Sequence, residues 1–250
     1  MTSPPAVAVA EVIGHLDAAL KHAVTHQPRS LQRELGPSEI GCPCDRRLGY
    51  RLAGVDPVNP HLPWLAYLGT ALHGRLAADL DGRTLPDGAR LLAEQPLDVG
   101  EVGGRTVTGT SDLYVAGVVV DWKLVGTTSL RRYRAHGPGH QYRVQLHTYG
   151  RGYRRRGLPV THVAIAFLPR TRELVHRHWW HEPYDERIAV EALRRVEAIA
   201  AAVAAAGPHV LPLLRTAEAH CLYCPWFRPG STDLTRACPG TAGLLTPVPI

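Results

Sequence analysis

The sequence contains no uninterrupted apolar run near the roughly 18 residues that a membrane-spanning helix needs. Its first residues lack the basic group that opens a signal peptide, and Glu11 and Asp17 interrupt the apolar part that follows. We find no internal repeat and no low-complexity linker. Charged residues make up 20% and hydrophobic residues 45% of the 250 residues, which excludes wholesale disorder. We therefore expect a soluble, cytoplasmic protein with a core of its own.

Cysteine is scarce, and its five copies stand near the two ends of the chain, as Cys42, Cys44, Cys221, Cys224 and Cys238. An odd number of clustered cysteines in a reducing compartment favours a metal site over disulfides. The Cys221-x2-Cys224 spacing suits a tetrahedral metal or an iron–sulfur cluster. With only Cys238 left in the C-terminal part, a fourth ligand has to come from the distant 42–44 segment.

Positive charge is only moderately in excess, with 28 Lys and Arg against 22 Asp and Glu. This balance permits nucleic acid as a partner without requiring it. Two arginine groups flank the segments discussed below, at Arg131, Arg132 and Arg134 and at Arg151, Arg154, Arg155 and Arg156. They could line a groove for a phosphate backbone, with Tyr133, Tyr142 or Tyr153 stacking on bases. Alternatively, the second group complements the dipole at a helix C-terminus.

Periodicity predicts helices over 7–25, 64–80, 138–156 and 185–206. Strands are predicted over 91–99, 105–115, 118–125, 161–169 and 173–181. Ser38 is expected to cap a short helix that carries Cys44, Arg46, Arg47 and Tyr50. The tail from residue 209 is rich in Pro and Gly, so we expect a cross-link, such as a bound metal, to hold it in place. The order of elements predicts an α/β domain with an antiparallel meander.

One predicted hairpin carries acidic residues at defined positions. If Ala116-Gly117 form a two-residue turn, Val115 pairs with Val118 and Asp112 faces Asp121. Two opposed carboxylates repel each other by up to about 1 kcal/mol, and a divalent cation between them would offset that cost. Lys123 projects from the same face as Asp121 because the two are two residues apart.

Two carboxylates and a lysine suit metal-assisted hydrolysis of a phosphodiester. Oxygen ligands hold Mg²⁺ or Mn²⁺, which lowers the pKa of a bound water and neutralises charge on the phosphate. Lys123 can then orient the water or stabilise the phosphate oxygens. The alternative is an ordinary Asp–Lys pair on a surface hairpin. The run of Val118, Val119 and Val120 argues against it, because such a run is typical of a buried central strand.

Asp112 followed by Asp121-Trp122-Lys123 resembles the signature of the PD-(D/E)XK nucleases, and the order of elements resembles their core of helix, three-stranded meander, helix and strand. The segment LGTALHGRL at 68–76 and the Gln145-x3-Tyr149 motif resemble the RecB-like branch. The resemblance implies a metal site formed by His73, Asp112, Asp121 and the Trp122 carbonyl, with Glu94 nearby. It also implies catalytic roles for Asp112, Asp121, Lys123, Gln145 and Tyr149.

Each of these motif residues also has an ordinary structural interpretation. A histidine among leucines, such as His73, is more often a buried and hydrogen-bonded residue. Gln145 and Tyr149 lie on one helix face, where they could instead be solvent-facing and half-buried. A glutamate at a strand edge, such as Glu94, is commonplace.

The cysteines resemble those of RecB-like exonucleases with an iron–sulfur cluster, including the CRISPR-associated branch and its phage relatives. This resemblance implies a 4Fe-4S cluster on Cys44, Cys221, Cys224 and Cys238, or Zn²⁺ on the same thiolates as the alternative. Cys44 is preferred because Cys44-Asp45-Arg46-Arg47 fits the C-x-R-R pattern of the family, although Cys42-Pro43 also resembles a family dipeptide. The interval from Cys224 to Cys238 is longer than is usual there.

The resemblance thus implies one domain of 250 residues in three parts: an N-terminal helical segment (1–60), a nuclease core (61–181), and a helix with the C-terminal cluster segment (182–250). It implies a Mg²⁺- or Mn²⁺-dependent exonuclease that acts on single-stranded DNA ends in recombination and repair, phage DNA processing or CRISPR spacer acquisition, with possible protein partners. The alternative is a non-catalytic nucleic-acid-binding module that keeps the fold and the metal staple.

Overall fold

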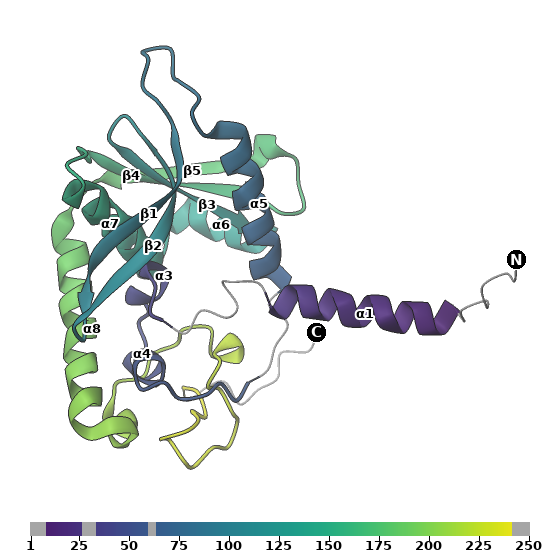
Figure 1. Ribbon diagram of the computed structural model, residues 1–250, viewed down its shortest axis with the longest axis vertical. Coiled ribbons are helices and arrows are strands. Elements are labelled where there is room, and N and C mark those ends of the chain that lie inside the picture. Colours follow the sequence, from purple (N-terminus) through teal and green to yellow (C-terminus); the bar gives the residue numbers. More distant parts are fainter. Residues whose placement is uncertain (1–8, 27–33, 60–63, 242–250) are drawn as a thin grey trace, which may run out of the picture.

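A computed structural model of the chain describes residues 9–26, 34–59 and 64–241. Its centre is a five-stranded sheet in the order β1-β2-β3-β4-β5 (Figure 1). The strands are β1 (Leu92–Val102), β2 (Arg105–Val115), β3 (Val118–Val125), β4 (His162–Pro169) and β5 (His178–Pro183). Only β3 and β4 are parallel among the neighbouring pairs. The predicted α/β fold class is confirmed. The strand predicted over 173–181 corresponds to β5 at the edge of the sheet, which begins later because Leu174–His176 form a 3-10 turn.

The connection between the parallel strands consists of α6 (Thr127–His136) and α7 (His140–Arg155). Parallel neighbours need such a crossover because the end of the first strand and the start of the second lie at opposite edges of the sheet. The predicted helix over 138–156 corresponds to α7, whereas α6 was not predicted. Its sequence, TTSLRRYRAH, is short and mostly polar, and only Leu130 and Tyr133 are buried.

Helices cover the two faces of the sheet. On one face, α7 and α8 (Glu186–Ala206) pack on a core that includes Val119, Ile165 and Phe167. On the other face, α5 (Trp64–Leu80) packs Leu72, Leu76 and Leu80 against a smaller core around Trp122. Because successive side chains of a strand point to opposite faces, β3 contributes to both cores. This confirms the prediction of a buried central strand, and the predicted 64–80 helix matches α5.

The hairpin between β2 and β3 has the predicted register. Val115 pairs with Val118, and both turn residues, Ala116 and Gly117, have positive φ (48° and 83°). Two positive φ angles define the type I′ turn, whose twist matches that of the flanking strands. The register therefore brings Asp112 and Asp121 to corresponding positions of the two strands.

The N-terminal part differs in detail from the prediction. Helix α1 (Val9–Thr25) points away from the rest of the chain (Figure 1); residues 7 and 8 of the predicted helix lie outside the described residues. Instead of one short helix capped by Ser38, there are two, α3 (Pro37–Ile40) and α4 (Asp45–Leu52). Ser38 lies inside α3, and Cys44 is the N-cap residue of α4. The Gly41-Cys42-Pro43 segment separates them, because a residue before proline is disfavoured in helical conformation.

The C-terminal tail follows α8 through short 3-10 turns, η2 (Gly207–Leu213) and η3 (Cys221–Tyr223), and lies beside α4 (Figure 1). The segment Glu186–Leu213 is long and apolar enough to cross a membrane by length and composition alone. Within it, Ala189, Val196 and Ile199 are buried, and α8 contacts α7 and β1. This is the packing of an amphipathic helix on a sheet.

Candidate active site

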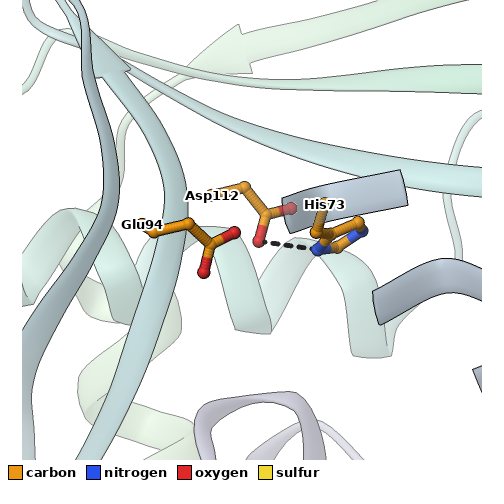
Figure 2. Close-up of side chains that lie close together, drawn as sticks. All are labelled: His73, Glu94 and Asp112. Carbon is orange, nitrogen blue, oxygen red and sulfur yellow. Dashed lines mark ion pairs between the residues drawn. The ribbon is translucent and has the colours of Figure 1, made fainter. Parts of the chain in front are cut away.

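Three elements bring potential metal ligands together at one end of the β2–β3 hairpin. His73 of α5, Glu94 of β1 and Asp112 of β2 each offer a ligand atom, and these atoms all lie within 4.8 Å of one another (Figure 2). The neighbouring pairs Ala93–Leu113 and Gln95–Ser111 set Glu94 opposite Asp112. Glu94 has a positive φ of 46°, a strained conformation for a glutamate and one that often occurs at functional sites.

Asp112 also organises the backbone of β3. The β2–β3 ladder ends at the pair Leu113–Val120, and Asp112 Oδ2 then accepts a hydrogen bond of 2.8 Å from the Trp122 N–H. His73 contacts the same place with both ring nitrogens: Nδ1 lies 3.3 Å from Asp112 Oδ1, and Nε2 donates to the Trp122 carbonyl at 3.0 Å. His73 thus contacts both of the other predicted ligands, Asp112 and the Trp122 carbonyl.

Asp121 and Lys123 form a second group with Gln145 of α7. Lys123 Nζ lies 2.7 Å from Asp121 Oδ2, and Gln145 Nε2 donates to Asp121 Oδ1 at 2.9 Å. Lys123 Nζ also donates to Gln145 Oε1 at 3.3 Å, which closes the triangle. The Asp121 side chain is only 2% exposed and that of Lys123 15%. Gln145 therefore fixes the geometry of a largely buried ion pair.

The two groups influence each other electrostatically. Burial raises the pKa of Asp121 to about 6; Lys123 opposes this shift, and the nearby Asp112 carboxylate reinforces it. Burial alone would lower the pKa of His73, but hydrogen bonding to Asp112 and the charges of Asp112 and Asp121 outweigh it and raise that pKa. Negative charge therefore dominates the site, which favours a cation.

The two tyrosines near Gln145 on α7 serve different purposes. Tyr149, predicted to be catalytic, is buried and packs against β2, where a Cβ on Gly109 would lie 3.4 Å from its ring. Tyr142 lies one turn before Gln145, and Lys123 Nζ lies 4.9 Å from the centre of its ring. Sequence reasoning considered Tyr142 only for base stacking. The i, i+3 spacing from Gln145 was a signal that it shares a face with the site.

Four cysteines surround a small cavity of about 20 Å³ between α4 and the tail. The cysteines in its lining are Cys44, Cys221, Cys224 and Cys238. Cys42 is not among the lining residues; its thiol lies 3.9 Å from the carbonyl oxygen of Cys44. Burial raises the pKa of Cys224 to about 11, so without a metal this thiol is neutral at physiological pH.

The two arginines after Cys44 connect α4 to the tail. Arg46 donates to the carbonyl oxygens of Leu211 and Pro212 at 2.9 and 2.8 Å, and Arg47 donates to that of Ala219 at 3.0 Å. Tyr50 also donates to the Leu234 carbonyl oxygen at 2.7 Å. No role could be assigned to Arg46 and Arg47 from the sequence. They hold the two halves of the cysteine cavity together.

The arginines at the end of α7 contribute to the fold as well. Arg151 donates to the Val99 carbonyl oxygen at 2.7 Å, and Arg156 donates to that of Pro96. Both bonds attach α7 to β1. This structural role accounts for two of the four arginines that were candidates for a DNA groove.

No protein-family model matches the sequence, and a search of curated proteins finds no relative. Among solved structures, the chain is similar to the alkaline exonuclease LHK-Exo from Laribacter hongkongensis, with 12% identity and a TM-score of 0.49 over 72% of this chain and 93% of that one. It is also similar to SSO0001, with 18% identity and a TM-score of 0.48 over 88% of this chain and 95% of that one. At these values, function has to be argued from the side chains of this chain.

Proposed function

We propose that the protein is a metal-dependent DNA exonuclease. The observation that supports this best is the convergence of His73, Glu94 and Asp112 beside the buried Asp121–Lys123 pair. Carboxylate, carbonyl and imidazole ligands suit Mg²⁺ or Mn²⁺, and the metal site would comprise His73, Glu94, Asp112, Asp121 and the Trp122 carbonyl. A metal bound there supplies a water of lowered pKa and neutralises charge on the scissile phosphate.

Lys123 and Gln145 are the residues that would act on the substrate side. Lys123 is a preorganised cation, held between Asp121 and Gln145, that can orient the attacking water or stabilise the phosphate oxygens. Gln145 is a positioning residue, since it holds both members of the ion pair. Preference for single-stranded ends, and a pathway in repair, phage DNA processing or spacer acquisition, belong to this proposal through the resemblance alone.

The experiment is digestion of end-labelled single-stranded DNA by purified protein with Mg²⁺ or Mn²⁺. Wild-type protein should degrade the strand, and Asp121→Ala and Lys123→Ala should each lower the rate by about 10³-fold or more. Lys21→Ala, a change of an exposed lysine on α1 that pairs with Asp17, is the matched control for Lys123→Ala and should retain most of the rate. Wild-type protein that binds DNA but leaves it intact with both metals would instead identify a non-catalytic binding module.

We further propose a 4Fe-4S cluster on Cys44, Cys221, Cys224 and Cys238. Cys44, Cys221, Cys224 and Cys238 line one cavity, and four cysteine thiolates are the ligand set of a cubane cluster. The same four thiolates would also hold Zn²⁺. The resemblance to the nucleases with an iron–sulfur cluster is what favours the cluster.

Anaerobic purification with metal analysis tests the cluster. We expect brown protein with broad absorbance near about 400 nm and iron with acid-labile sulfide. Cys44→Ser should remove the colour, whereas Cys42→Ser should keep it. Colourless protein with one zinc per chain would contradict the cluster and support the zinc alternative.

A further inference from the structure

A second cavity, of about 430 Å³, opens next to the proposed active site. It begins where β3 ends, since Leu124 and Val125 line it directly after Lys123. Tyr142, whose ring lies under the Lys123 ammonium group, is also part of its wall. Lys123 and Val125 are about 7 Å apart along the strand. A nucleic-acid strand held at the active site would therefore pass this cavity within one or two nucleotides.

Positive charge dominates the lining. Arg132 of α6 and Arg170, which follows β4, both line the cavity, and its lining contains no Asp or Glu. Neither arginine forms an ion pair with an acidic side chain of the described residues. The larger cavity beside α8 differs: its arginines share the lining with Glu101 and Glu197. The cavity beside Lys123 thus combines proximity to the site with unbalanced positive charge.

Both arginines are held in place by their surroundings. The Arg132 guanidinium lies over the Tyr133 ring, 5.0 Å from its centre, and donates to the Tyr133 hydroxyl at 3.1 Å. Arg170 donates its backbone N–H to the Val125 carbonyl oxygen at 2.9 Å. Its guanidinium lies against Gly126, where a Cβ would come within 3.1 Å of Nη2. Glycine at 126 therefore leaves room for the Arg170 side chain at the cavity wall.

Hydroxyl and backbone N–H groups at the start of α6 also suit an anion in this cavity. The first turn of α6 contributes Thr127, Thr128 and Ser129 to the cavity, contains no acidic residue, and has no side-chain hydrogen bond from its N-cap residue. Hydroxyl groups and the amides of a helix start donate to phosphate oxygens. His220, the residue directly before Cys221, also lines the cavity, so the cysteine-bearing tail contributes to its wall.

We propose that this cavity binds a backbone phosphate of the substrate strand next to the cleavage site, with Arg132 and Arg170 as its cationic contacts. The proposal rests on the proposed nuclease function for its substrate, but it concerns residues outside the metal site. Each arginine that contacts a phosphate releases about one condensed counterion from the nucleic acid. Replacing such an arginine with a neutral residue therefore weakens binding and makes the affinity less dependent on salt.

The test is equilibrium binding of a short fluorescent single-stranded DNA by anisotropy, in EDTA so that no strand is cleaved. Arg170→Ala should weaken binding about five- to twentyfold at moderate salt and reduce the slope of log K against log salt by about one. Arg170→Lys should recover most of the affinity, because it restores the charge. Arg172→Ala, an exposed arginine outside the cavity lining, is the matched control and should change binding less than about twofold.

One further comparison makes the result decisive, in which the titrations are repeated with and without a terminal phosphate on the DNA. Equal losses on both strands support a backbone phosphate in this cavity, whereas a loss only on the phosphorylated strand would overturn that assignment in favour of a terminal phosphate. Equal effects of Arg170→Ala and Arg172→Ala would overturn the proposal as a whole. Failure of the nuclease proposal has a different signature, since it would leave wild-type binding intact without cleavage when metal is added.

Discussion

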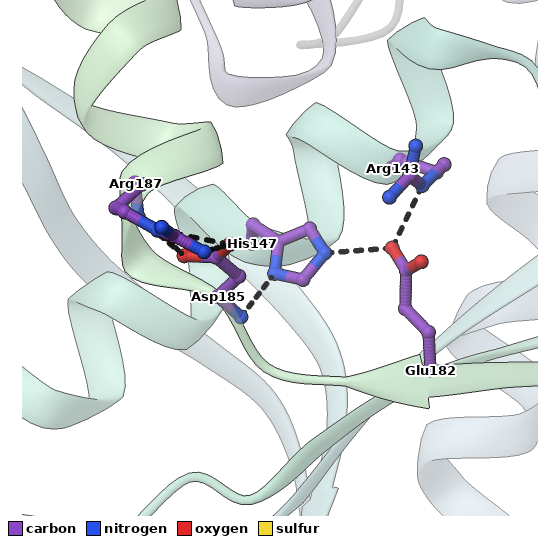
Figure 3. Close-up of polar contacts among 5 residues, drawn as sticks. All are labelled: Arg143, His147, Glu182, Asp185 and Arg187. Carbon is purple, nitrogen blue, oxygen red and sulfur yellow. Dashed lines mark hydrogen bonds and ion pairs between the residues drawn. The ribbon is translucent and has the colours of Figure 1, made fainter.

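Two polar clusters lie on the same helix, α7, and differ in how their charges are balanced. Gln145 belongs to the candidate active site, where Glu94, Asp112 and Asp121 face one lysine and one histidine. Two residues later, His147 belongs to a cluster at the other side of the helix, with Glu182 of β5 and Arg143 (Figure 3). There one carboxylate is matched by one guanidinium, and the histidine is neutral.

The second cluster is closed by its hydrogen bonds. His147 is fully buried; its Nδ1 accepts from the Asp185 backbone N–H at 3.1 Å, so its Nε2 carries the proton and donates to Glu182 at 2.8 Å. Arg143 donates to the same Glu182 oxygen at 2.8 Å. Such a satisfied network stabilises the fold, whereas the active-site cluster retains an excess of negative charge that a bound cation would balance. One helix thus serves stability and function through different faces.

The largest expected effect is a loss of activity without a loss of stability, at Asp112 in the active site. Asp112→Asn should lower the nuclease rate by about 10³-fold or more, because it removes a charged metal ligand. The same change should leave the metal-free protein at least as stable, since it removes one of the mutually repelling carboxylates, a gain of about 0–1 kcal/mol. Nuclease assays and thermal unfolding in EDTA measure the two effects. A variant that loses activity only because its melting temperature falls sharply would contradict the assignment.

At His147 we expect the opposite pattern, a loss of stability without a loss of activity. His147→Ala leaves a cavity, removes one of the two hydrogen-bond donors to Glu182 and removes the acceptor of the Asp185 amide, so it should cost about 2–4 kcal/mol of unfolding free energy. Activity per folded molecule should stay within about threefold of wild type at a temperature where the variant is folded. His136→Ala, an exposed change at the end of α6, is the control and should cost less than about 0.5 kcal/mol. Urea unfolding and nuclease rates, measured on the same samples, decide between the outcomes.

Local patterns predicted the elements that carry the active-site cluster. The 64–80 helix, the strands at 105–115 and 118–125 and the Ala116-Gly117 turn follow from periodicity and turn chemistry, and the register of Asp112 with Asp121 follows from the turn. The partners of His147 could not be predicted, since Glu182 lies 35 residues away on an edge strand. The contacts of Arg46 with the tail and of Arg170 with Val125 could not be predicted for the same reason. Their contacts join segments that are paired only by the tertiary fold, and no short-range pattern encodes them.

The smallest expected effect is on the pH dependence of stability, and it comes from His147 in the closed cluster. Burial lowers the pKa of His147, with Glu182 opposing and Arg143 assisting the shift. The unfolded chain therefore binds a proton near pH 6.5 that the folded protein excludes, so this histidine's contribution is fully present above that pH and is lost as the pH falls below it. Protonation would also place a hydrogen on Nδ1, which now accepts from the Asp185 N–H. Two donors would then face each other without an acceptor.

Comparing wild type with His147→Gln by urea unfolding at pH 7.5 and pH 5.5 isolates this histidine from the others. Glutamine can still hydrogen-bond to Glu182 but cannot become charged. Wild type should lose about 1 kcal/mol more than the variant between the two pH values, because one excluded proton is worth up to about 1.4 kcal/mol per pH unit below the unfolded-state pKa. Identical losses in the two proteins would mean that the pKa of His147 is the same in the folded and unfolded states, and a smaller loss in wild type would mean that folding raises it. In either case the folded protein would not exclude the proton, and the cluster would be less closed than its geometry indicates.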